Sequence, residues 1–417
     1  MKCFAQDLLR QLGAEIRSPE FLESNRTDGK WFSRSRMLAF SSCVCMILSR
    51  LTTSLRNEIG AFFENVLAAD KSVTPQAFSK ARRHIKPEAF VRLFDITRDA
   101  ALRSHAIRRF RGYRLFAIDG SDVQLPTGVE LQACYPSANS STPKSARAHA
   151  SVLCDVMTGF ALDALLEPEY VDERSMAERH LDAYVAFAMR RDLLIMDRGY
   201  PSKKLLHRLS RLPGKFLLRV SGSFQTAFAR FDVSDYHTHI EYEGEKVYFR
   251  VVRIELSSGV TETLVTNLSD HSMPLQALCE LYAKRWGVET VFRNLKDRLS
   301  LIRFSGHSKQ TVLQDFFACV TFFNISCAFC AQDEQNRLEN HADDCLKHKY
   351  VTNRCACFSF LKRHLASMLL FAKRASRLIG ALFAVLASAL SPVRPGRSFP
   401  RAASRSDHRA TSQRPPF

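Results

Sequence analysis

The order of apolar and polar side chains divides the chain into segments of different secondary structure. Within the first 110 residues, apolar side chains recur three and four positions apart, as in Ile59, Phe62, Phe63 and Val66. This is the spacing of helices that bury one face. We therefore predict a helical domain over residues 1–110.

Short apolar runs typical of β-strands begin after this helical region. One run ends at Asp119 and another at Asp197, each directly before a turn. More runs of this kind lie between them, and residues 173–191 have helical spacing. Because strands and helices alternate, we predict an α/β fold in which helices flank a mixed sheet.

The region after Asp197 contains alternating and β-branched runs separated by glycine, serine and aspartate, which indicates a β-rich insertion. Helical spacing then returns and ends in a tail rich in arginine, serine and proline, which we expect to be disordered. The expected segments are an N-terminal helical domain (1–110), the first part of the core (111–212), the insertion (213–272), the completion of the core (273–330), a C-terminal helical region (331–390) and the tail (391–417).

Net charge adds information about the partner. The chain has 60 Lys and Arg against 42 Asp and Glu, a formal charge of +18. Such an excess favours a polyanion, with nucleic acid ahead of an anionic membrane surface. The longest apolar run, residues 378–390, is shorter than the ~20 residues of a spanning helix, so we expect no membrane partner. The start of the chain lacks the pattern of a secretion signal, so we expect a cytoplasmic, nucleoid-associated protein.

The 12 cysteines raise the question of a zinc site. Cys327 and Cys330 have the spacing of one ligand pair, and further Cys and His residues follow. However, no second short pair lies at a recognisable distance. The aromatic and aliphatic residues around these cysteines are more typical of a core helix, in which free cysteine acts as a small apolar side chain.

A basic helix in the N-terminal region is a candidate for binding DNA. Thr74 and Pro75 form a helix start, and Lys80, Arg82 and Arg83 follow on that helix. A turn and a basic second helix would suit a DNA-binding helical pair. A solvated basic face on an ordinary helix explains the same pattern.

Asp119 and Asp197 are the first two candidate catalytic residues. An acid at the end of an apolar strand holds a hard oxygen ligand on a rigid element, as Mg²⁺ requires. Both aspartates should therefore emerge at an edge of the sheet. The nearest alternatives, should one of these assignments fail, are Asp122 and Asp155.

The third candidate acid lies in a segment that we predict to be one helix. Tyr282, Arg285, Glu289 and Lys296 fall within about 60° of one another on such a helix. Ordinary pairing of charges four residues apart explains Arg285 with Glu289, but it does not explain the tyrosine or the lysine. Gly287 weakens a helix, which suggests that another group approaches it closely.

These residues resemble those of a known family, the bacterial insertion-sequence transposases with a DDE catalytic triad. That family has a Tyr-x2-Arg-x3-Glu-x6-Lys signature, whose spacing matches the four residues just named. The likeness extends to the turns after Asp119 and Asp197 and spans roughly residues 75–330.

The resemblance implies a ribonuclease-H-like core that a β-strand insertion interrupts before the glutamate. It also implies that Asp119, Asp197 and Glu289 hold two Mg²⁺ ions, with Mn²⁺ as an alternative, and that these ions clamp the oxygens at the scissile phosphate. Residues expected to contact DNA lie on the glutamate's helix and on the basic N-terminal helix: Tyr282, Arg285, Arg293, Lys296, Lys80, Arg82 and Arg83.

The activity implied is cut-and-paste transposition. Water attack frees a 3′ hydroxyl at the transposon end, and this hydroxyl later attacks target DNA. The expected partners are transposon ends and target DNA, with a homodimer in the synaptic complex. Two alternatives stay open: a catalytically inactive DNA-binding relic of a transposase, and a metal-dependent nuclease of the same fold without strand transfer.

Overall fold

The structure is a computed structural model of the chain. It describes residues 3–34, 37–49, 54–104, 106–137, 146–226, 228, 233–255, 259, 261–269, 273–299, 301, 303–340 and 350–393. The chain forms two compact units. The first consists of Met1–Ala106, Val123–Ala148 and Asn294–Phe417, and the second of Ile107–Asp122 and His149–Arg293.

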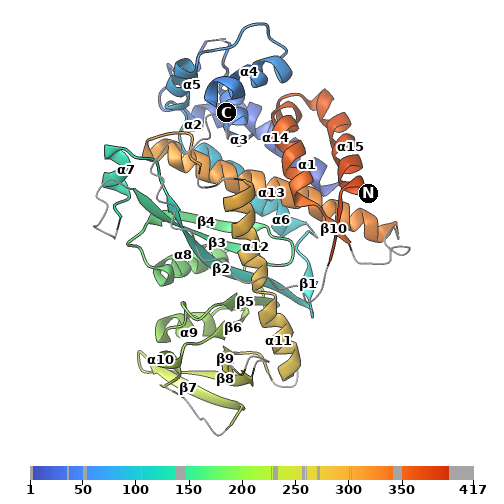
Figure 1. The fold of residues 1–417 in the computed structure, drawn as a ribbon. Helices are drawn as coiled ribbons and strands as arrows, with labels where there is room; N and C mark the ends of the chain where they lie inside the picture. Colours follow the sequence, from blue (N-terminus) through green and yellow to red (C-terminus); the bar gives the residue numbers. More distant parts are fainter. Residues whose placement is uncertain are drawn as a thin grey trace. The chain divides into compact units, whose positions relative to one another are not determined.

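A mixed sheet forms the centre of the second unit (Figure 1). Its strands, in spatial order, are β4 (Ala161–Pro168), β3 (Arg147–Asp155), β2 (Tyr113–Gln124), β5 (Asp192–Met196), β6 (Lys215–Arg219), β9 (Thr261–Thr266), β8 (Glu245–Glu255) and β7 (Asp235–Tyr242), and β1 (Arg109–Phe110) pairs with β2. β2, β5 and β6 run parallel to one another, whereas β9 is antiparallel to β6, β8 to β9, and β7 to β8. The prediction of a mixed sheet is confirmed.

Helices of the second unit pack against this sheet. They are α8 (Glu173–Val185), α9 (Lys203–Ser210), α10 (Gly222–Gln225), α11 (Leu275–Ala283) and α12 (Trp286–Arg293). All five residues of β5 are buried, as expected for a central parallel strand. Leu193 and Ile195 of β5 belong to one apolar cluster with Leu278 and Leu281 of α11. This core fixes α11 relative to the strands that carry the two aspartates.

The β-rich region after Asp197 continues the main sheet. The predicted β-rich insertion contains β7, β8 and β9, and β9 pairs with β6. Glu243 and Gly244 both have positive φ, which suits the tight turn between β7 and β8. The insertion is thus an antiparallel extension of the sheet.

The first unit is mainly helical. Its elements are α1 (Phe4–Arg17), α2 (Pro19–Asn25), α3 (Phe40–Leu48), α4 (Leu55–Asn65), α5 (Pro75–Arg82), α6 (Glu88–Arg103), α7 (Val129–Cys134), the π-helix η1 (Asn294–Arg298), α13 (Lys309–Glu339), α14 (Arg354–Leu370), α15 (Ala372–Ser388) and the paired strands β10 (Tyr350–Thr352) and β11 (Leu390–Pro392). The Thr74 side chain accepts a hydrogen bond from the Ala77 amide at 3.1 Å, which confirms the predicted start of α5.

α13 is the core helix of the first unit. It is long and apolar enough to cross a membrane. However, 89% of its most apolar stretch is buried inside the protein, as in the core helix of a soluble protein. Cys319, Cys327 and Cys330 are buried along it, as predicted for free thiols in a core helix. Among the described residues, no group of cysteine, histidine and acidic side chains could hold a metal ion; residues 341–349 lie outside this description.

The C-terminal segments differ in part from the prediction. Residues 391 and 392, assigned to the disordered tail, belong to β11. The tail from residue 394 onward lies outside the described residues. The apolar run 378–390 lies mostly in α15, where Ile379, Leu382 and Leu386 are buried. The spacing of these buried residues is that of an amphipathic helix.

Candidate active site

Asp119 and Asp197 occupy corresponding positions on neighbouring strands. β2 and β5 run parallel, and the last pair in their register joins Ala117 with Ile195. Each aspartate comes two residues after this pair. Because parallel strands keep a constant offset, the two aspartates lie at the same level across the sheet. Asp197 directly follows β5 as predicted, but Asp119 lies within β2, which continues to Gln124, so the predicted strand end and turn at Asp119 are wrong.

A buried ion pair at the opposite end of the two strands fixes this register. The Arg114 guanidinium donates hydrogen bonds to both carboxylate oxygens of Asp192, at 2.6 and 2.7 Å. The Tyr184 hydroxyl donates a third bond to Asp192 at 2.9 Å. A shift of the strand pairing by one residue would separate these buried charges and move the apolar side chains of the strand to the opposite face of the sheet. The register is therefore strongly specified.

Glu289 lies on α12, and the prediction of one helix through its segment is wrong. Lys284 and Arg285 separate α11 from α12, and the π-helix η1 follows α12. At the break, the Arg285 amide donates to the carbonyl oxygen of Tyr282 at 2.9 Å, which is the tighter three-residue pattern of a 3₁₀ turn. Mid-helix departures of both kinds are frequent at functional sites.

Gly287 explains why the helix can sit where it does. A Cβ atom at this position would lie 2.5 Å from the backbone oxygen of Val156. Val156 directly follows β3, so only glycine lets the first turn of α12 approach this part of the sheet. The close approach predicted from the sequence is confirmed.

Arg285 links two of the three candidate acids. Its Nη2 lies 3.0 Å from Oε1 of Glu289 and 4.0 Å from Oδ2 of Asp197. The residue is only 7% exposed, and its Nε is buried without a hydrogen-bond partner. One guanidinium therefore compensates two carboxylates in a largely dry environment.

Two further side chains contact Asp197. The Tyr282 hydroxyl donates a hydrogen bond to Asp197 Oδ1 at 3.1 Å. Arg219, at the end of β6, has one guanidinium nitrogen 4.0 Å from the same oxygen and another 3.1 Å from Glu262. Tyr282 and Arg285, two residues of the sequence signature, thus converge on the second aspartate.

The environments of the two aspartates shift their pKa values in opposite directions. The pKa of Asp119 is raised to about 6, mainly by burial and also by the charges of Glu173 and Glu289, against the opposing effects of the Gly120 amide and Arg285. Burial also acts on Asp197, but the Arg198 amide, Arg285, Tyr282 and Arg219 outweigh it and lower the pKa of that carboxyl. Such opposed shifts are typical of functional sites.

A buried hydrogen-bond chain supports the backbone of Asp119. The Ser151 hydroxyl lies 3.1 Å from the carbonyl oxygen of Asp119 and 2.9 Å from Nε2 of His180. His180 Nδ1 lies 2.7 Å from Oδ2 of Asp163. Ser151 and His180 are buried, so these groups are not open to a substrate. They hold β2, β3, β4 and α8 together behind the candidate site.

The two alternative aspartates have other contacts. Asp122 Oδ1 lies 2.9 Å from Nδ1 of His149. Asp155 is fully buried at the end of β3, where its carboxylate accepts hydrogen bonds from the amide and hydroxyl of Thr158 in the following turn. Asp155 therefore stabilises a turn and is a poor candidate for a metal ligand.

The donor set of Asp119, Asp197 and Glu289 suits a hard divalent cation, because all three supply carboxylate oxygens. The guanidinium between two of them shows that this edge of the sheet accommodates a positive charge. In the present side-chain arrangement, no group of three acidic, histidine or cysteine side chains among the described residues is close enough to hold an ion.

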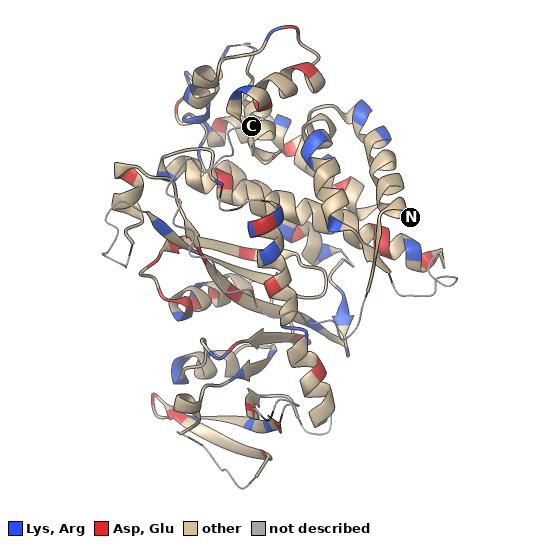
Figure 2. Cartoon of the chain, viewed as in Figure 1, with Lys and Arg blue, Asp and Glu red and all other residues tan. Residues whose placement is uncertain are grey.

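The remaining predicted DNA contacts lie on several elements. Arg293 is exposed at the end of α12, and Lys296 lies in η1, which belongs to the first unit. Lys80 and Arg83 are exposed on and directly after α5. Lysine and arginine occur on helices of the first unit and on both strands and helices of the second (Figure 2). These four residues stay predictions.

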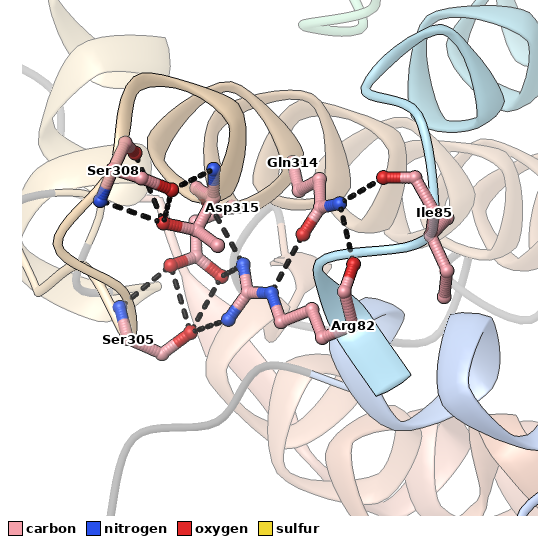
Figure 3. A network of polar contacts seen from close by, with 7 residues as sticks. Arg82, Ile85, Ser305, Ser308, Gln314 and Asp315 are labelled. Carbon is pink, nitrogen blue, oxygen red and sulfur yellow. Dashed lines mark hydrogen bonds and ion pairs between the residues drawn. The ribbon is translucent and has the colours of Figure 1, made fainter. Parts of the chain in front are cut away.

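Arg82 does not fit the predicted role in DNA binding. It is 3% exposed, and its guanidinium pairs with the buried carboxylate of Asp315 at 2.9 Å (Figure 3). It also donates to Gln314 Oε1 at 2.6 Å and to the Ser305 hydroxyl. With these donors engaged inside the first unit, Arg82 joins α5 to α13 and is not presented to a phosphate. The prediction for this residue is wrong.

Several side chains near the candidate site were not identified from the sequence. Arg219 ends an apolar strand beside β5, so the strand-end rule that identified the aspartates could have found it. Tyr200 belongs to the turn after Asp197. His149 and Glu173 carry no local signal, because only the fold brings them beside these turns.

Comparison with known proteins gives the class of this protein. Residues 110–325, more than half of the chain, match the model of a family described as the transposase DDE domain. This region contains Asp119, Asp197 and the helix of Glu289. The chain therefore belongs to the DDE transposase family, and the protein is a transposase.

Comparisons with individual proteins give less information about the class than the family model does. No curated protein matches the chain. Among solved structures, the chain is similar to a piggyBac transposase in a synaptic complex with hairpin DNA, determined by cryo-EM. The two share 12% sequence identity with a TM-score of 0.46, over 94% of this chain and 87% of that one.

Proposed function

We propose that this transposase cuts DNA at transposon ends and joins the freed ends to target DNA, the reactions of cut-and-paste transposition. The observation that carries the proposal is the parallel register that aligns Asp119 with Asp197. Glu289 joins them through Arg285, which pairs with both Glu289 and Asp197. Membership of the DDE transposase family supports assigning the three acids to catalysis.

A ribonuclease-H-like core is part of the proposal. Its support is a mixed sheet with flanking helices, in which the antiparallel strands β7, β8 and β9 fall between Asp197 and Glu289 in the chain. An insertion at this point is what the sequence resemblance implies. A rigid sheet edge for the acids is also what a metal-dependent reaction needs.

The proposed cofactors are two Mg²⁺ ions, with Mn²⁺ as an alternative. Asp119, Asp197 and Glu289 would hold them. When bound, such ions activate a water molecule and neutralise charge on the phosphate oxygens. Before metal binding, Arg285 compensates Asp197 and Glu289, and the Tyr282 hydroxyl orients Asp197.

DNA is the proposed partner, and its phosphates are the groups that the exposed cations would contact. Arg293, Lys296, Lys80 and Arg83 are the proposed contacts, and they would position the duplex without reading its sequence. A homodimer in the synaptic complex and action on nucleoid DNA in the cytoplasm complete the proposal.

Cleavage and joining assays test this function. Purified protein with Mg²⁺ would be incubated with a plasmid that carries the gene between its native flanking sequences, together with a target plasmid. We expect cuts at the element ends and joined products. Asp119→Asn, Asp197→Asn and Glu289→Gln should each abolish both while retaining binding to end DNA. Glu241→Gln, an exposed acid on β7, is the matched control and should keep both activities.

The two alternative functions predict other products. An inactive relic would bind end DNA but leave it intact with Mg²⁺. A nuclease without strand transfer would cut the ends and give no joined product. Either outcome with well-folded wild-type protein would contradict the proposal.

A further inference from the structure

Glu173 brings a fourth carboxylate to the candidate site. It is the first residue of α8, and the preceding residue, Asp172, caps this helix by accepting hydrogen bonds from the Arg174 and Ser175 amides. Asp172 therefore caps the helix, and the Glu173 side chain, which is 44% exposed, is not needed for capping.

One oxygen of Glu173 lies near the strand residue that follows Asp119. Oε1 lies 3.8 Å from Nε2 of His149. That imidazole nitrogen in turn packs directly on Gly120, leaving no room there for a Cβ atom. Gly120 follows Asp119 within β2, so the glutamate reaches the strand beside the first aspartate through one histidine.

The other oxygen of Glu173 faces the turn that follows Asp197. A Cβ atom on Gly199 would lie 3.3 Å from Oε2 of Glu173. Gly199 is two residues after Asp197 in sequence. The carboxylate of Glu173 thus lies between Gly120 of β2 and the turn that follows Asp197.

Two buried polar atoms beside Glu173 have no hydrogen-bond partner. They are the hydroxyl of Tyr200, a residue only 2% exposed, and Nε2 of His149, a residue only 8% exposed. Burial raises the pKa of the Tyr200 hydroxyl, and the charges of Glu173, Asp119 and Asp197 raise it further, in keeping with its place in the turn after Asp197. Leaving a buried hydroxyl unpaired is unfavourable, which favours a ligand that would accept its hydrogen bond.

Glu173 adds a negative charge to the part of the site that holds the two aspartates, because it approaches Gly120 and Gly199, which follow them in the chain. Neighbouring carboxylates repel one another unless a cation lies between them. Arg285 compensates Asp197 and Glu289, but no ion pair joins any described arginine or lysine to Asp119 or Glu173 within 4 Å.

We propose that Glu173 binds a divalent metal ion together with Asp119, and that the Tyr200 hydroxyl donates a hydrogen bond to a water molecule on that ion. The inference rests on the proposed function, because it adds a ligand to the same site. A structural role for Glu173 at the helix start would not explain its position between Gly120 of β2 and the turn after Asp197.

Metal binding by the full-length chain tests the proposal without relying on activity. Mn²⁺ binding would be measured by electron paramagnetic resonance, and melting temperatures would be measured with and without Mn²⁺. Glu173→Gln should weaken Mn²⁺ binding about tenfold or more and reduce the metal-induced rise in melting temperature. Its metal-free melting temperature should be no lower than that of the wild type, because one repulsive charge has been removed.

Companion variants separate the contributions. Tyr200→Phe should weaken Mn²⁺ binding less than Glu173→Gln does. Glu173→Asp, which keeps the charge on a shorter side chain, should fall between Glu173→Gln and the wild type. Asp182→Asn changes an exposed acid further along α8 and is the matched control, so its Mn²⁺ affinity should be that of the wild type.

The outcomes distinguish this inference from the proposed function. Wild-type affinity in Glu173→Gln, with binding lost in Asp119→Asn, would overturn only the role of Glu173. A metal-free melting temperature well below the wild type in Glu173→Gln would show a structural role and overturn it as well. Failure of the wild-type protein to bind Mn²⁺ would overturn both this inference and the proposed function.

Discussion

At the scale of single residues, Arg285 compensates the negative charge of the candidate site when no metal is bound. Its guanidinium pairs with Glu289 and approaches Asp197, and these contacts are largely shielded from water. Both contacts are made by the same nitrogen, Nη2. The arginine therefore compensates the acids of the candidate site, in addition to the DNA contact predicted for it from the sequence.

Removing this arginine should leave the negative charges of Asp197 and Glu289 uncompensated. We expect Arg285→Ala to lower the stability of the metal-free protein by about 1–3 kcal/mol, because Asp197 and Glu289 would repel each other. Mg²⁺ should then raise the melting temperature more than it does in the wild type. Thermal unfolding with and without Mg²⁺ measures both effects, and an unchanged Mg²⁺ response would contradict this account.

Asp119 should make the stability of the metal-free protein depend on pH. Its pKa is raised from 3.8 to about 6 in the folded state, so the folded state binds the proton more tightly than the unfolded state. Stability should therefore fall as pH rises from about 4 to 6 and then level off. Asp119→Asn should weaken this decline relative to the wild type. Equal slopes in unfolding experiments across this range would show that Asp119 is not perturbed.

At the scale of elements, the end of β5 before Asp197 could be predicted from the sequence, whereas the continuation of β2 past Asp119 and the interruption of the glutamate's helix could not. An apolar run that ends in an acid is a local pattern, but pairing with neighbouring strands decides how far a strand continues. The close approach of Gly287 to Val156 is also a contact between residues far apart in the chain. Likewise, Lys80 and Arg82 look alike in sequence, and only the partner Asp315 shows that Arg82 is buried.

The close approach at Gly287 gives a prediction at this scale. Gly287→Ala should destabilise the protein by about 1–3 kcal/mol, because a methyl group would press on the Val156 carbonyl. Gly60→Ala is the control, since a Cβ atom there meets no heavy atom within 4 Å and alanine favours a helix. Thermal unfolding should thus show opposite signs, and stabilisation by both substitutions would refute the close contact.

The chain of Asp163, His180 and Ser151 predicts an effect on catalysis without contact to substrate. Ser151→Ala removes the hydroxyl beside the Asp119 carbonyl, so the first aspartate should be held less firmly. We expect the rate of end cleavage to fall about tenfold or more, with end-DNA binding unchanged. Ser210→Ala, at the exposed end of α9, should leave the rate unaltered. A wild-type rate in Ser151→Ala would mean that Asp119 needs no such support.

At the scale of the whole molecule, two units are built from interleaved parts of the chain. The chain leaves the sheet-containing unit after Asp122, returns to it at His149 and leaves it again after Arg293. Consecutive sequence segments could not predict this grouping, because the contacts that define each unit join residues distant in sequence. The candidate acids nevertheless belong to one unit, which contains Asp119, Asp197 and Glu289.

The central claim is that these three acids hold the catalytic metal. Anomalous X-ray scattering from a crystal of the full-length protein soaked in Mn²⁺ tests it most directly. We expect a peak within about 2.3 Å of a carboxylate oxygen of Asp119 and of at least one of Asp197 and Glu289, and its loss in a crystal of Asp119→Asn. A wild-type crystal with no peak at this edge of the sheet, or with Mn²⁺ bound only elsewhere, would contradict the account.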